Sequence, residues 1–242
     1  MNDEVGGLAV RVEGLTKGFG GFPVLRNLDV SVGWGRFLAI FGANGSGKTT
    51  FLKILSTQYS LDKGKIWMAG IPRNEDPVFI RKIIGVVAHQ PMLYQDMTTL
   101  ENLLFFSRMY RIPDSRKRVE EIIELFSIKS LIQRRVGTLS HGMQKRVAIA
   151  RALLHIPPIL LMDEPESGLD QESLGLVIKI LQDYVKQGRT VLMTTHNVDI
   201  GLALANEVAV LSNGAFSYYG NREGIDADSF RSTHLSRIEV TR

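Results

Sequence analysis

The chain reads Gly42-Ala43-Asn44-Gly45-Ser46-Gly47-Lys48-Thr49 between two segments of different character. The apolar run Phe37–Phe41 precedes this stretch and predicts a buried strand. Lys48–Gln58 follows it with apolar residues spaced as in a buried helix. The sequence therefore predicts a strand, a glycine-rich loop and a helix in direct succession.

The glycine-rich stretch matches the P-loop pattern. In such a loop, backbone N–H groups wrap phosphate oxygens, the lysine reaches the β and γ phosphates, and the helix N-terminus adds the positive end of its dipole. We expect ATP to bind here and the Thr49 hydroxyl to be a ligand of Mg²⁺. The expected nucleotide-binding residues are Gly42, Ala43, Asn44, Gly45, Ser46, Gly47, Lys48, Thr49 and Thr50.

A second apolar strand, Ile159–Met162, ends in the acids Asp163 and Glu164. Two adjacent carboxylates would repel each other at a strand end unless a cation lay nearby, and Mg²⁺ held by Thr49 would provide one. We expect Asp163 to bind the metal and Glu164 to polarise the attacking water as a general base. A solvated acid pair is the alternative. Up to this point, any P-loop ATPase or small-molecule kinase would fit the sequence.

The order of the elements predicts an α/β fold. Leu8–Glu13 and Val24–Val32 alternate like strands, whereas residues 92–156 are mostly helical. Within the helical part, Thr98–Glu101 forms a capping-box pattern, and a helix from His141 to about His155 is expected to stop before Pro157-Pro158. A helix over Gln171–Gln187 capped by Asp170 and a strand over Thr190–Thr194 are expected to follow. We expect one domain over 1–242: a P-loop NTPase (RecA-like) core from 1–91 and 157–220, with an N-terminal antiparallel β subdomain. An inserted α-helical subdomain is expected at 92–156 and a C-terminal tail at 221–242.

Residues Leu139–Arg146 resemble the signature motif of ABC ATPases, and Ser140 would cap the helix that follows. The chain is similar to that family at further places in family order: Phe19, Gln90, the Glu164–Asp170 segment and Thr195-His196. Taken singly, Phe19 could be a core residue, Gln90 a solvated loop residue and His196 an ordinary strand-end histidine.

The resemblance implies a mechanism in which two ATPase domains enclose two ATP molecules. Phe19 would stack on adenine, and Ser140, His141 and Gly142 would bind the γ-phosphate held by the partner. Gln90 would approach the metal, and His196 would contact the γ-phosphate and the attacking water. The implied catalytic residues are Glu164, His196, Lys48 and Gln90, and the implied metal ligands are Thr49, Gln90 and Asp163.

Three residues depart from the family pattern. His141 stands where glycine is usual, Met143 where glutamine is usual, and Glu166 where threonine is usual. The backbone N–H at His141 remains available to an anion, while its side chain crowds the turn. We expect an active ATPase with altered dimer contacts, and the sequence leaves the hydrogen bonding of Glu166 open.

The composition of the chain limits the classes of partner that it is expected to bind. A net charge of +4 over 242 residues is modest and far from the dense basic stripe of a nucleic-acid binder, so no nucleic-acid partner is expected. The stretch Arg108–Arg151 holds eleven Lys and Arg against four acids, which indicates solvated helix faces or a face near phosphates or lipid headgroups. Without cysteine the chain has no disulfide or thiolate metal site. No run of about 20 apolar residues exists to cross a bilayer, so a partner would have to supply any membrane span. The resemblance implies a separate transmembrane permease subunit, with the chain at the cytoplasmic face of the membrane. The second ATPase would be an identical copy or a related one.

One P-loop lies 115 residues before Asp163 (163 − 48) with no heptads between, which favours a transporter subunit over repair ATPases. Segments such as Glu101–Tyr110 and Ala152–His155 look like the haem-exporter ATPase of cytochrome c maturation. Another exporter, or a non-transport soluble ATPase of this type, is the alternative. The membrane partner would contact apolar residues that could equally be core: Leu93, Tyr94, Met97, Leu103 and Phe106.

Overall fold

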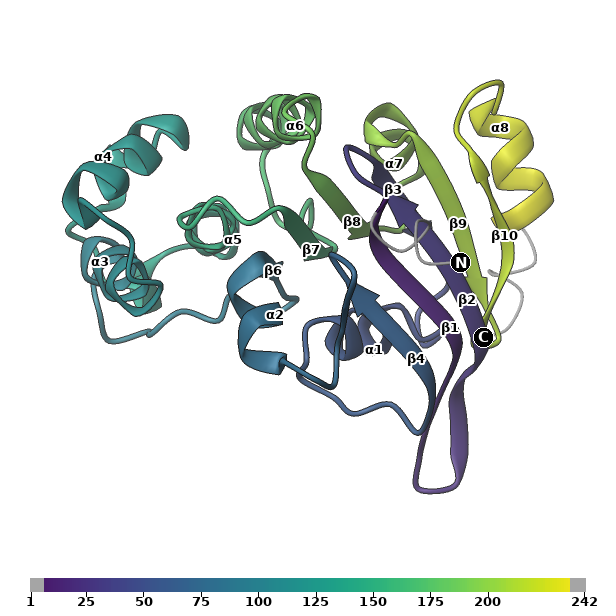
Figure 1. The fold of residues 1–242 in the computed structure, drawn as a ribbon. Coiled ribbons are helices and arrows are strands. Elements are labelled where there is room, and N and C mark those ends of the chain that lie inside the picture. Colours follow the sequence, from purple (N-terminus) through teal and green to yellow (C-terminus); the bar gives the residue numbers. More distant parts are fainter. Residues whose placement is uncertain (1–6, 236–242) are drawn as a thin grey trace.

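A computed structural model of the protein describes residues 7–235. Its strands form two sheets, a six-stranded one of order β10-β9-β3-β8-β7-β6 and a four-stranded one of order β2-β1-β4-β5 (Figure 1). The strands are β1 Leu8–Phe19, β2 Phe22–Gly33, β3 Phe37–Phe41, β4 Lys63–Met68, β5 Ile71–Pro72, β6 Ile84–Val87, β7 Ile159–Asp163, β8 Thr190–Thr194, β9 Glu207–Ser212 and β10 Ala215–Asn221.

The α-helices lie beside the two sheets and at one end of the molecule (Figure 1). They are α1 Lys48–Leu55, α2 Pro77–Ile83, α3 Thr99–Met109, α4 Ser115–Leu125, α5 His141–Ala152, α6 Gln171–Lys186, α7 Val198–Leu204 and α8 Ala227–Phe230. Short 3-10 turns lie at Lys129–Leu131 and Val136–Thr138, and a π-turn lies at Arg231–Leu235. Within residues 7–235, no helix combines the length and apolar character needed to span a bilayer.

The larger sheet brings two chemically important strand ends together. β3 pairs in parallel with β8, and β8 pairs in parallel with β7, so these three strands end at one edge of the sheet. All residues of β3, β7 and β8 are buried, as expected for parallel strands covered on both faces. The glycine-rich loop leaves β3 at the same edge where β7 ends in Asp163, with β8 between them.

The second sheet is antiparallel, and its long hairpin of β1 and β2 projects from the molecule (Figure 1). β1 extends to Phe19, well beyond the predicted end at Glu13. The reason is a register irregularity between Glu13 and Thr16, with Gly14 at φ +59°, which interrupts the alternation on which the prediction depended. The antiparallel β subdomain beside a mostly parallel core confirms the predicted fold class.

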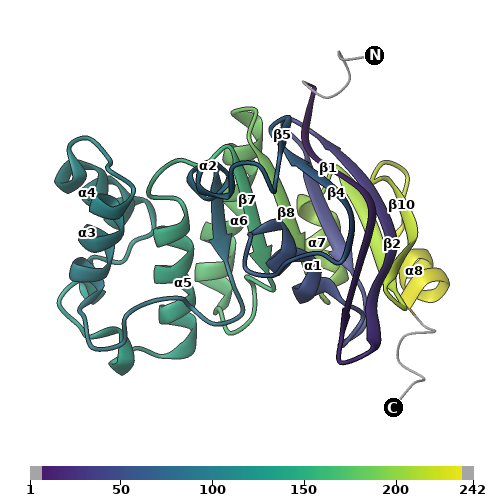
Figure 2. The same ribbon diagram turned by 60° about the horizontal axis from the view of Figure 1, so that its bottom comes forward.

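The helices α3, α4 and α5 lie at one end of the molecule, away from the antiparallel sheet (Figure 2). All three fall within residues 92–156, where the sequence predicts helices. The predicted capping box is present, since Thr98 accepts a hydrogen bond from the backbone of Glu101 and the Glu101 carboxylate accepts one from the backbone of Thr98. This end of the molecule is therefore joined to the core through β6 and β7, the strands that flank it in sequence.

Two helices end earlier than predicted. α1 stops at Leu55 instead of Gln58, because Thr57 takes a left-handed conformation with φ +64°. α5 stops at Ala152 instead of His155, and Ile156 is left-handed with φ +51° before the two prolines. In both places a left-handed residue follows the helix within a few positions, a feature that the apolar pattern does not reveal.

The segment predicted as a C-terminal tail is partly folded. After β10 ends at Asn221, α8 buries Phe230, whose ring centroid lies 5.3 Å from that of Phe41 in β3. Residues 236–242 of this segment lie outside the described part of the chain. The described part of the tail therefore packs on the strand that leads to the glycine-rich loop.

Candidate functional site

The glycine-rich loop wraps around the side chain of its own lysine. The Lys48 ammonium donates to the carbonyl of Gly42 at 2.7 Å and to that of Ala43 at 3.0 Å, and it is almost fully buried. Burial lowers the pKa of Lys48, and the carboxylates of Glu164, Asp163 and Glu166 oppose that shift. The loop thus holds a buried ammonium that can exchange its carbonyl partners for an anion.

The loop also requires glycine where it approaches β2. Gly47 has φ +109°, and a Cβ there would lie 2.7 Å from Leu25 Cδ2, so a larger residue would be strained and would collide. The neighbouring Ser46 hydroxyl is buried without a hydrogen-bond partner. Because buried polar groups are normally satisfied, this hydroxyl fits a cradle built for an oxygen-rich ligand.

Asp163 accepts hydrogen bonds at both carboxylate oxygens. Thr49 Oγ1 donates to Oδ2 at 2.8 Å, and Thr194 Oγ1 at the end of β8 donates to Oδ1 at 2.6 Å. The structure therefore brings together the two residues expected to bind the metal, Thr49 and Asp163, across 114 residues of sequence. Thr194 was not among the predicted site residues, although it ends a predicted strand directly before Thr195-His196.

This pair of oxygen donors fits Mg²⁺. Hydroxyl and carboxylate oxygens are ligands that Mg²⁺ accepts, and the ion commonly takes one or two protein ligands together with substrate phosphates and water. Among residues 7–235, no cluster of three or more His, Cys, Asp or Glu side chains could hold a metal ion without other ligands. A metal at Thr49 and Asp163 would therefore depend on phosphate oxygens to complete its coordination.

Glu164 lies between a lysine and a histidine. Its carboxylate is 4.0 Å from the Lys48 ammonium at one oxygen and 3.6 Å from His196 Nδ1 at the other. Its backbone is left-handed, with φ +47°, a strained conformation that is often found at functional sites. The structure thus places three of the predicted catalytic residues in one group, and the His196 side chain is 63% exposed.

Glu166 has a partner that the sequence did not indicate. Its carboxylate accepts a short hydrogen bond from the Thr195 hydroxyl, which also accepts one from the backbone N–H of Asn197 at 2.9 Å. Burial raises the pKa of Glu166, and its second oxygen is buried without a hydrogen bond. Glu166 therefore ties the loop after Glu164 to the loop that carries His196.

The residues contributed by the helical end stand apart from this group. Ser140 caps α5 as predicted, since its hydroxyl accepts a hydrogen bond from the backbone of Met143 at 3.3 Å. Gln90 is exposed in the loop after β6. Among residues 7–235, no hydrogen bond or ion pair joins Ser140, His141 or Gln90 to Lys48, Thr49 or Asp163.

The start of α5 packs closely on the loop after Glu164. A Cβ on Gly142 would collide with the carbonyl of Gly168, and one on Gly168 would collide with the His141 imidazole. Gly168 also has φ +80°, so glycine is required there twice over. The departure at His141 therefore places an imidazole against Gly168, where a glycine would leave an open surface.

Phe19 lies at the end of β1, half-exposed, beside an aromatic ring that sequence reasoning missed. The ring centroids of Phe19 and Tyr59 are 5.5 Å apart in an edge-on arrangement, and the Lys17 ammonium lies 5.1 Å from the Phe19 ring centroid. Lys17 is fixed in turn by Asp62 at 2.7 Å. Phe19 is thus a supported, exposed ring rather than a core residue, which agrees with a stacking role.

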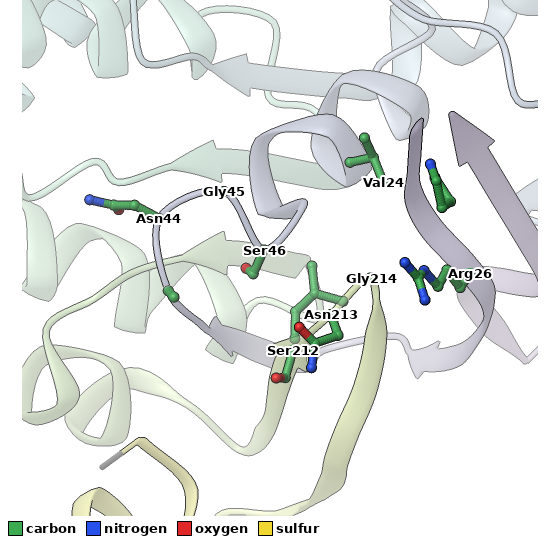
Figure 3. Close-up of a pocket in the computed structure, with 11 residues that line it drawn as sticks. Val24, Arg26, Asn44, Gly45, Ser46, Ser212, Asn213 and Gly214 are labelled. Carbon is green, nitrogen blue, oxygen red and sulfur yellow. The ribbon is translucent and has the colours of Figure 1, made fainter. Parts of the chain in front are cut away.

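A cavity of about 640 Å³ lies against the glycine-rich loop. Figure 3 shows Asn44, Gly45 and Ser46 on one side of it, with the strand that carries Val24 and Arg26 opposite. Ser212, Asn213 and Gly214 of the β9–β10 turn line it as well. Pro23 and Val24 follow the Phe19–Phe22 turn directly, so the cavity wall continues toward the exposed phenylalanine ring.

Of the apolar residues offered to a membrane partner, most belong to the core. Leu93, Leu103 and Phe106 are buried, so the alternative that they are core residues holds for these three. Tyr94 is half-exposed, and its ring packs against the exposed Phe105 at 5.1 Å. Between residues 92 and 109, the exposed large apolar residues are Met92, Tyr94, Phe105 and Met109.

A P-loop at the end of one parallel strand, with an acidic pair at the end of another, defines a nucleoside triphosphatase of the P-loop class. Similarity to known proteins identifies the family within this class. The family model described as "ABC transporter" matches residues 25–167. The ABC transporter ATP-binding protein NatA of Bacillus subtilis (strain 168) is 33% identical over 221 residues, which is 90% of this chain and 89% of that protein.

Two further similarities agree. The Nod factor export ATP-binding protein I of Rhizobium sp. (strain N33) is 35% identical over 86% of this chain and 69% of its own length. The dimeric ATP-binding cassette MJ0796, solved in a post-hydrolysis state with ADP and Pi, superposes with a TM-score of 0.82 at 28% identity, covering 89% of this chain and 100% of that one. The chain belongs to the ABC transporter family, and it is an ATPase subunit that couples ATP hydrolysis to transport.

Proposed function

We propose that the chain works as one of two ATPase subunits that close around two ATP molecules with Mg²⁺ and drive export through a separate transmembrane permease. The observation that carries this proposal is the group of Lys48, Thr49, Asp163 and Glu164 where β3 and β7 end. In this group a buried ammonium, a hydroxyl and two carboxylates meet at the start of a helix. The permease would hold the chain at the cytoplasmic face of the membrane.

Within one subunit, the loop would bind the triphosphate. Lys48 would turn from the carbonyls of Gly42 and Ala43 to the β and γ phosphates, and backbone N–H groups of the loop would donate to the same oxygens. Thr49 and Asp163 would hold Mg²⁺, and Gln90 would approach it when the helical end moves inward. When bound, the ion neutralises phosphate charge as the γ-phosphoryl group is transferred.

Glu164 is the proposed general base. It would accept a proton from the attacking water, while His196, 3.6 Å from its second oxygen, orients that water and the γ-phosphate. Glu166 would keep His196 in position through Thr195. The exposure of His196 fits this role, because its ring must reach a ligand that lies outside the protein core.

Pairing would complete the site. Ser140, His141 and Gly142 lie at the N-terminus of α5, where free N–H groups attract an anion, yet no hydrogen bond or ion pair ties them to this subunit's own phosphate loop in the described chain. A second copy or a related ATPase, facing the opposite way, would supply that helix end to the γ-phosphate. The dimeric state of the MJ0796 cassette supports this arrangement.

The adenine of ATP and the membrane partner would bind at separate places on the chain. The adenine would stack on Phe19, with Tyr59 behind it and the cavity wall at Pro23 and Val24 leading toward the phosphates. The permease would bind the exposed apolar surface formed by Met92, Tyr94, Phe105 and Met109, next to the Gln90 loop. This surface lies on the side of the molecule that carries the signature helix (Figure 1).

The names of relatives favour export over import. They include a Nod factor export protein and a daunorubicin resistance protein, 34% identical over 86% of this chain. None of the relatives named above refers to haem or to cytochrome c. Haem export therefore stays a prediction from resemblance, and another export cargo is the broader proposal.

Calorimetry of ATP binding tests the nucleotide site. We expect ATP to bind in the presence of Mg²⁺ and to bind much more weakly in EDTA. Absence of Mg²⁺-dependent binding by the folded protein would refute the site. Co-purification from membranes tests the partner, since a multi-span membrane protein should accompany the tagged chain, and recovery of soluble partners alone would favour the non-transport ATPase.

A further inference from the structure

The outer edge of β6 is covered by basic side chains from α5 and the residues just after it. β6 ends the six-stranded sheet, so its outward carbonyls lack a neighbouring strand. His155 Nε2 lies 3.0 Å from the carbonyl of Ile84, and the Arg151 guanidinium donates to that of Val86. Farther along, Lys145 Nζ lies 3.5 Å from the carbonyl of His89. Three basic side chains thus follow one strand edge toward Gln90.

The backbones are also close along this edge. A Cβ on Gly85 would lie 2.6 Å from the carbonyl of Ala152 and 2.7 Å from Pro157 Cγ. The C-terminal part of α5 is therefore fixed to β6 by tight packing and by two donors, Arg151 and His155. A movement of the helical end must then be absorbed nearer the start of α5, where Lys145 lies.

Lys145 differs from the other two residues because it touches a second segment. Its ammonium lies 3.5 Å from the carbonyl of Glu164 as well as 3.5 Å from that of His89. Its side chain is completely buried, and burial lowers the pKa of Lys145 while Asp163, Glu166 and Glu164 oppose that shift. One cation is therefore shared between the residue before Gln90 and the main chain of the proposed base.

We propose that Lys145 is a positioning residue for ATP hydrolysis, which ties α5 to the two segments that carry Gln90 and Glu164. Both of its contacts are at the long limit of a hydrogen bond, so a small rotation of α5 would shorten one and release the other. Its charge, together with that of the Lys48 ammonium, also balances the three carboxylates of Asp163, Glu164 and Glu166. The proposal rests on the roles given above to Gln90 and Glu164.

The test compares Lys145→Met, which keeps the length of the side chain and removes its charge, with Lys145→Arg, which keeps the charge. We expect Lys145→Met to lower kcat at least about tenfold with the KM for ATP within about twofold, because substrate binding does not involve this group. Lys145→Arg should recover most of the lost kcat. ATP binding by calorimetry should be similar in all three proteins.

Arg118→Met is the matched control. Arg118 is a part-buried basic residue that donates to two backbone carbonyls, those of Leu154 at 2.8 Å and Leu153 at 3.0 Å, and pairs with Glu121 at 3.0 Å. None of these partners belongs to the segments that carry Gln90 and Glu164. The Arg118→Met variant should have a lower melting temperature than wild type and the same kcat. If Lys145→Met lowers only the melting temperature, or if Lys145→Arg is as inactive as Lys145→Met, the residue is structural and the proposal is wrong.

Two further outcomes separate the possible failures. If Lys145→Met does not fold, Lys145→Gln provides the same comparison with a shorter neutral donor, and failure of both to fold beside a normal Lys145→Arg would assign Lys145 to stability alone. A wild-type protein without Mg²⁺-dependent ATP binding would overturn the proposed site itself. Normal wild-type turnover with unchanged Lys145→Met turnover would overturn only the inference about Lys145.

Discussion

The two sides of the proposed site differ in how far one chain completes them. At the ends of β3, β7 and β8, the functional side chains contact each other directly: Thr49 and Thr194 bind Asp163, and Lys48 and His196 flank Glu164. At the start of α5, the Ser140 hydroxyl accepts a hydrogen bond from within its own turn and makes none to another segment of residues 7–235, and Gln90 is exposed. The ends of β3, β7 and β8 therefore form an assembled side, whose contacts are made within one chain. The start of α5 and Gln90 form an open side, whose polar groups are available to another molecule.

This difference separates two kinds of dependence. The assembled side should bind nucleotide in a single copy, because its contacts are already made. The open side should matter only after a second ATPase domain arrives. Substitutions on the two sides should therefore divide into those that change binding or chemistry in one copy and those that change association, and the following experiments test that division in decreasing order of effect.

Removal of the proposed base should have the largest effect. Glu164→Gln should lower kcat by roughly 10²- to 10⁴-fold, the usual contribution of a well-placed general base. ATP affinity should be retained, and the protein should accumulate as a nucleotide-bound dimer in size-exclusion chromatography. Glu172→Gln, which changes an exposed acid in the first turn of α6, is the control. Full turnover by Glu164→Gln would remove Glu164 from the mechanism.

Removal of the loop ammonium should affect binding on the assembled side. Lys48→Ala should weaken the affinity for MgATP by roughly tenfold to a hundredfold, or about 1.4–2.8 kcal/mol, because a buried charge aimed at the phosphates is lost. Titration calorimetry measures this change, with Lys63→Ala on an exposed strand position as the control. Unchanged affinity would mean that Lys48 stays bound to the loop carbonyls when ATP is present.

The open side is tested by blocking it. Ser140→Arg should weaken ATP-dependent dimerisation by roughly tenfold or more, since a bulky charged side chain would enter the closed interface. Binding of MgATP to the single copy should stay within about twofold of wild type. Ser130→Arg, at an exposed position before the signature, is the control. Unaltered dimerisation in sedimentation experiments would contradict the idea that the two sides act in different subunits.

The smallest effect should concern stability and pH. Burial raises the pKa of Glu166 above its ordinary value of 4.5, so the unfolded chain ionises first as the pH rises. The folded state then binds more protons, and stability falls between pH 4.5 and the raised folded pKa. Glu166→Gln removes this loss. The difference in melting temperature between Glu166→Gln and wild type should therefore increase from pH 4 to pH 7. The increase should be about 2–4 °C for each kcal/mol of unfolding free energy that the substitution recovers.

A constant difference in melting temperature across that pH range would show that the Glu166 carboxyl titrates normally. Turnover of Glu166→Gln gives a second measurement, because the amide can still accept a hydrogen bond from Thr195. A modest change in kcat is therefore expected. A loss comparable to that of Glu164→Gln would assign Glu166 a direct part in the chemistry.

Local patterns predicted the parts of the site that lie within one segment. The glycine-rich loop, the acids after an apolar strand and the N-caps at Thr98, Ser140 and Asp170 are all present where the sequence predicted them. Each depends on neighbours within a few positions. The fold class also followed, because the order of strand and helix patterns limits the arrangements that a chain can adopt.

The missed residues all act through distant contacts. Thr194 meets Asp163 only because β8 lies between β3 and β7, an order that no local pattern states. Tyr59, in the turn after α1, reaches Phe19 at the end of β1, and Glu166 reaches Thr195 across 29 residues. Lys145 looked like one more base in a basic stretch, since its complete burial became visible only with α5 packed against the core.

The aromatic contact at the end of the chain has a practical consequence. Phe41, the last residue before the glycine-rich loop, is wedged between Gly201 of α7, where a Cβ would collide with its ring, and Phe230 of α8. A shortened version that stops after β10 would expose that ring to water next to the loop. Laboratories that trim or tag this terminus should therefore extend their expression boundary beyond Phe230 before measuring turnover.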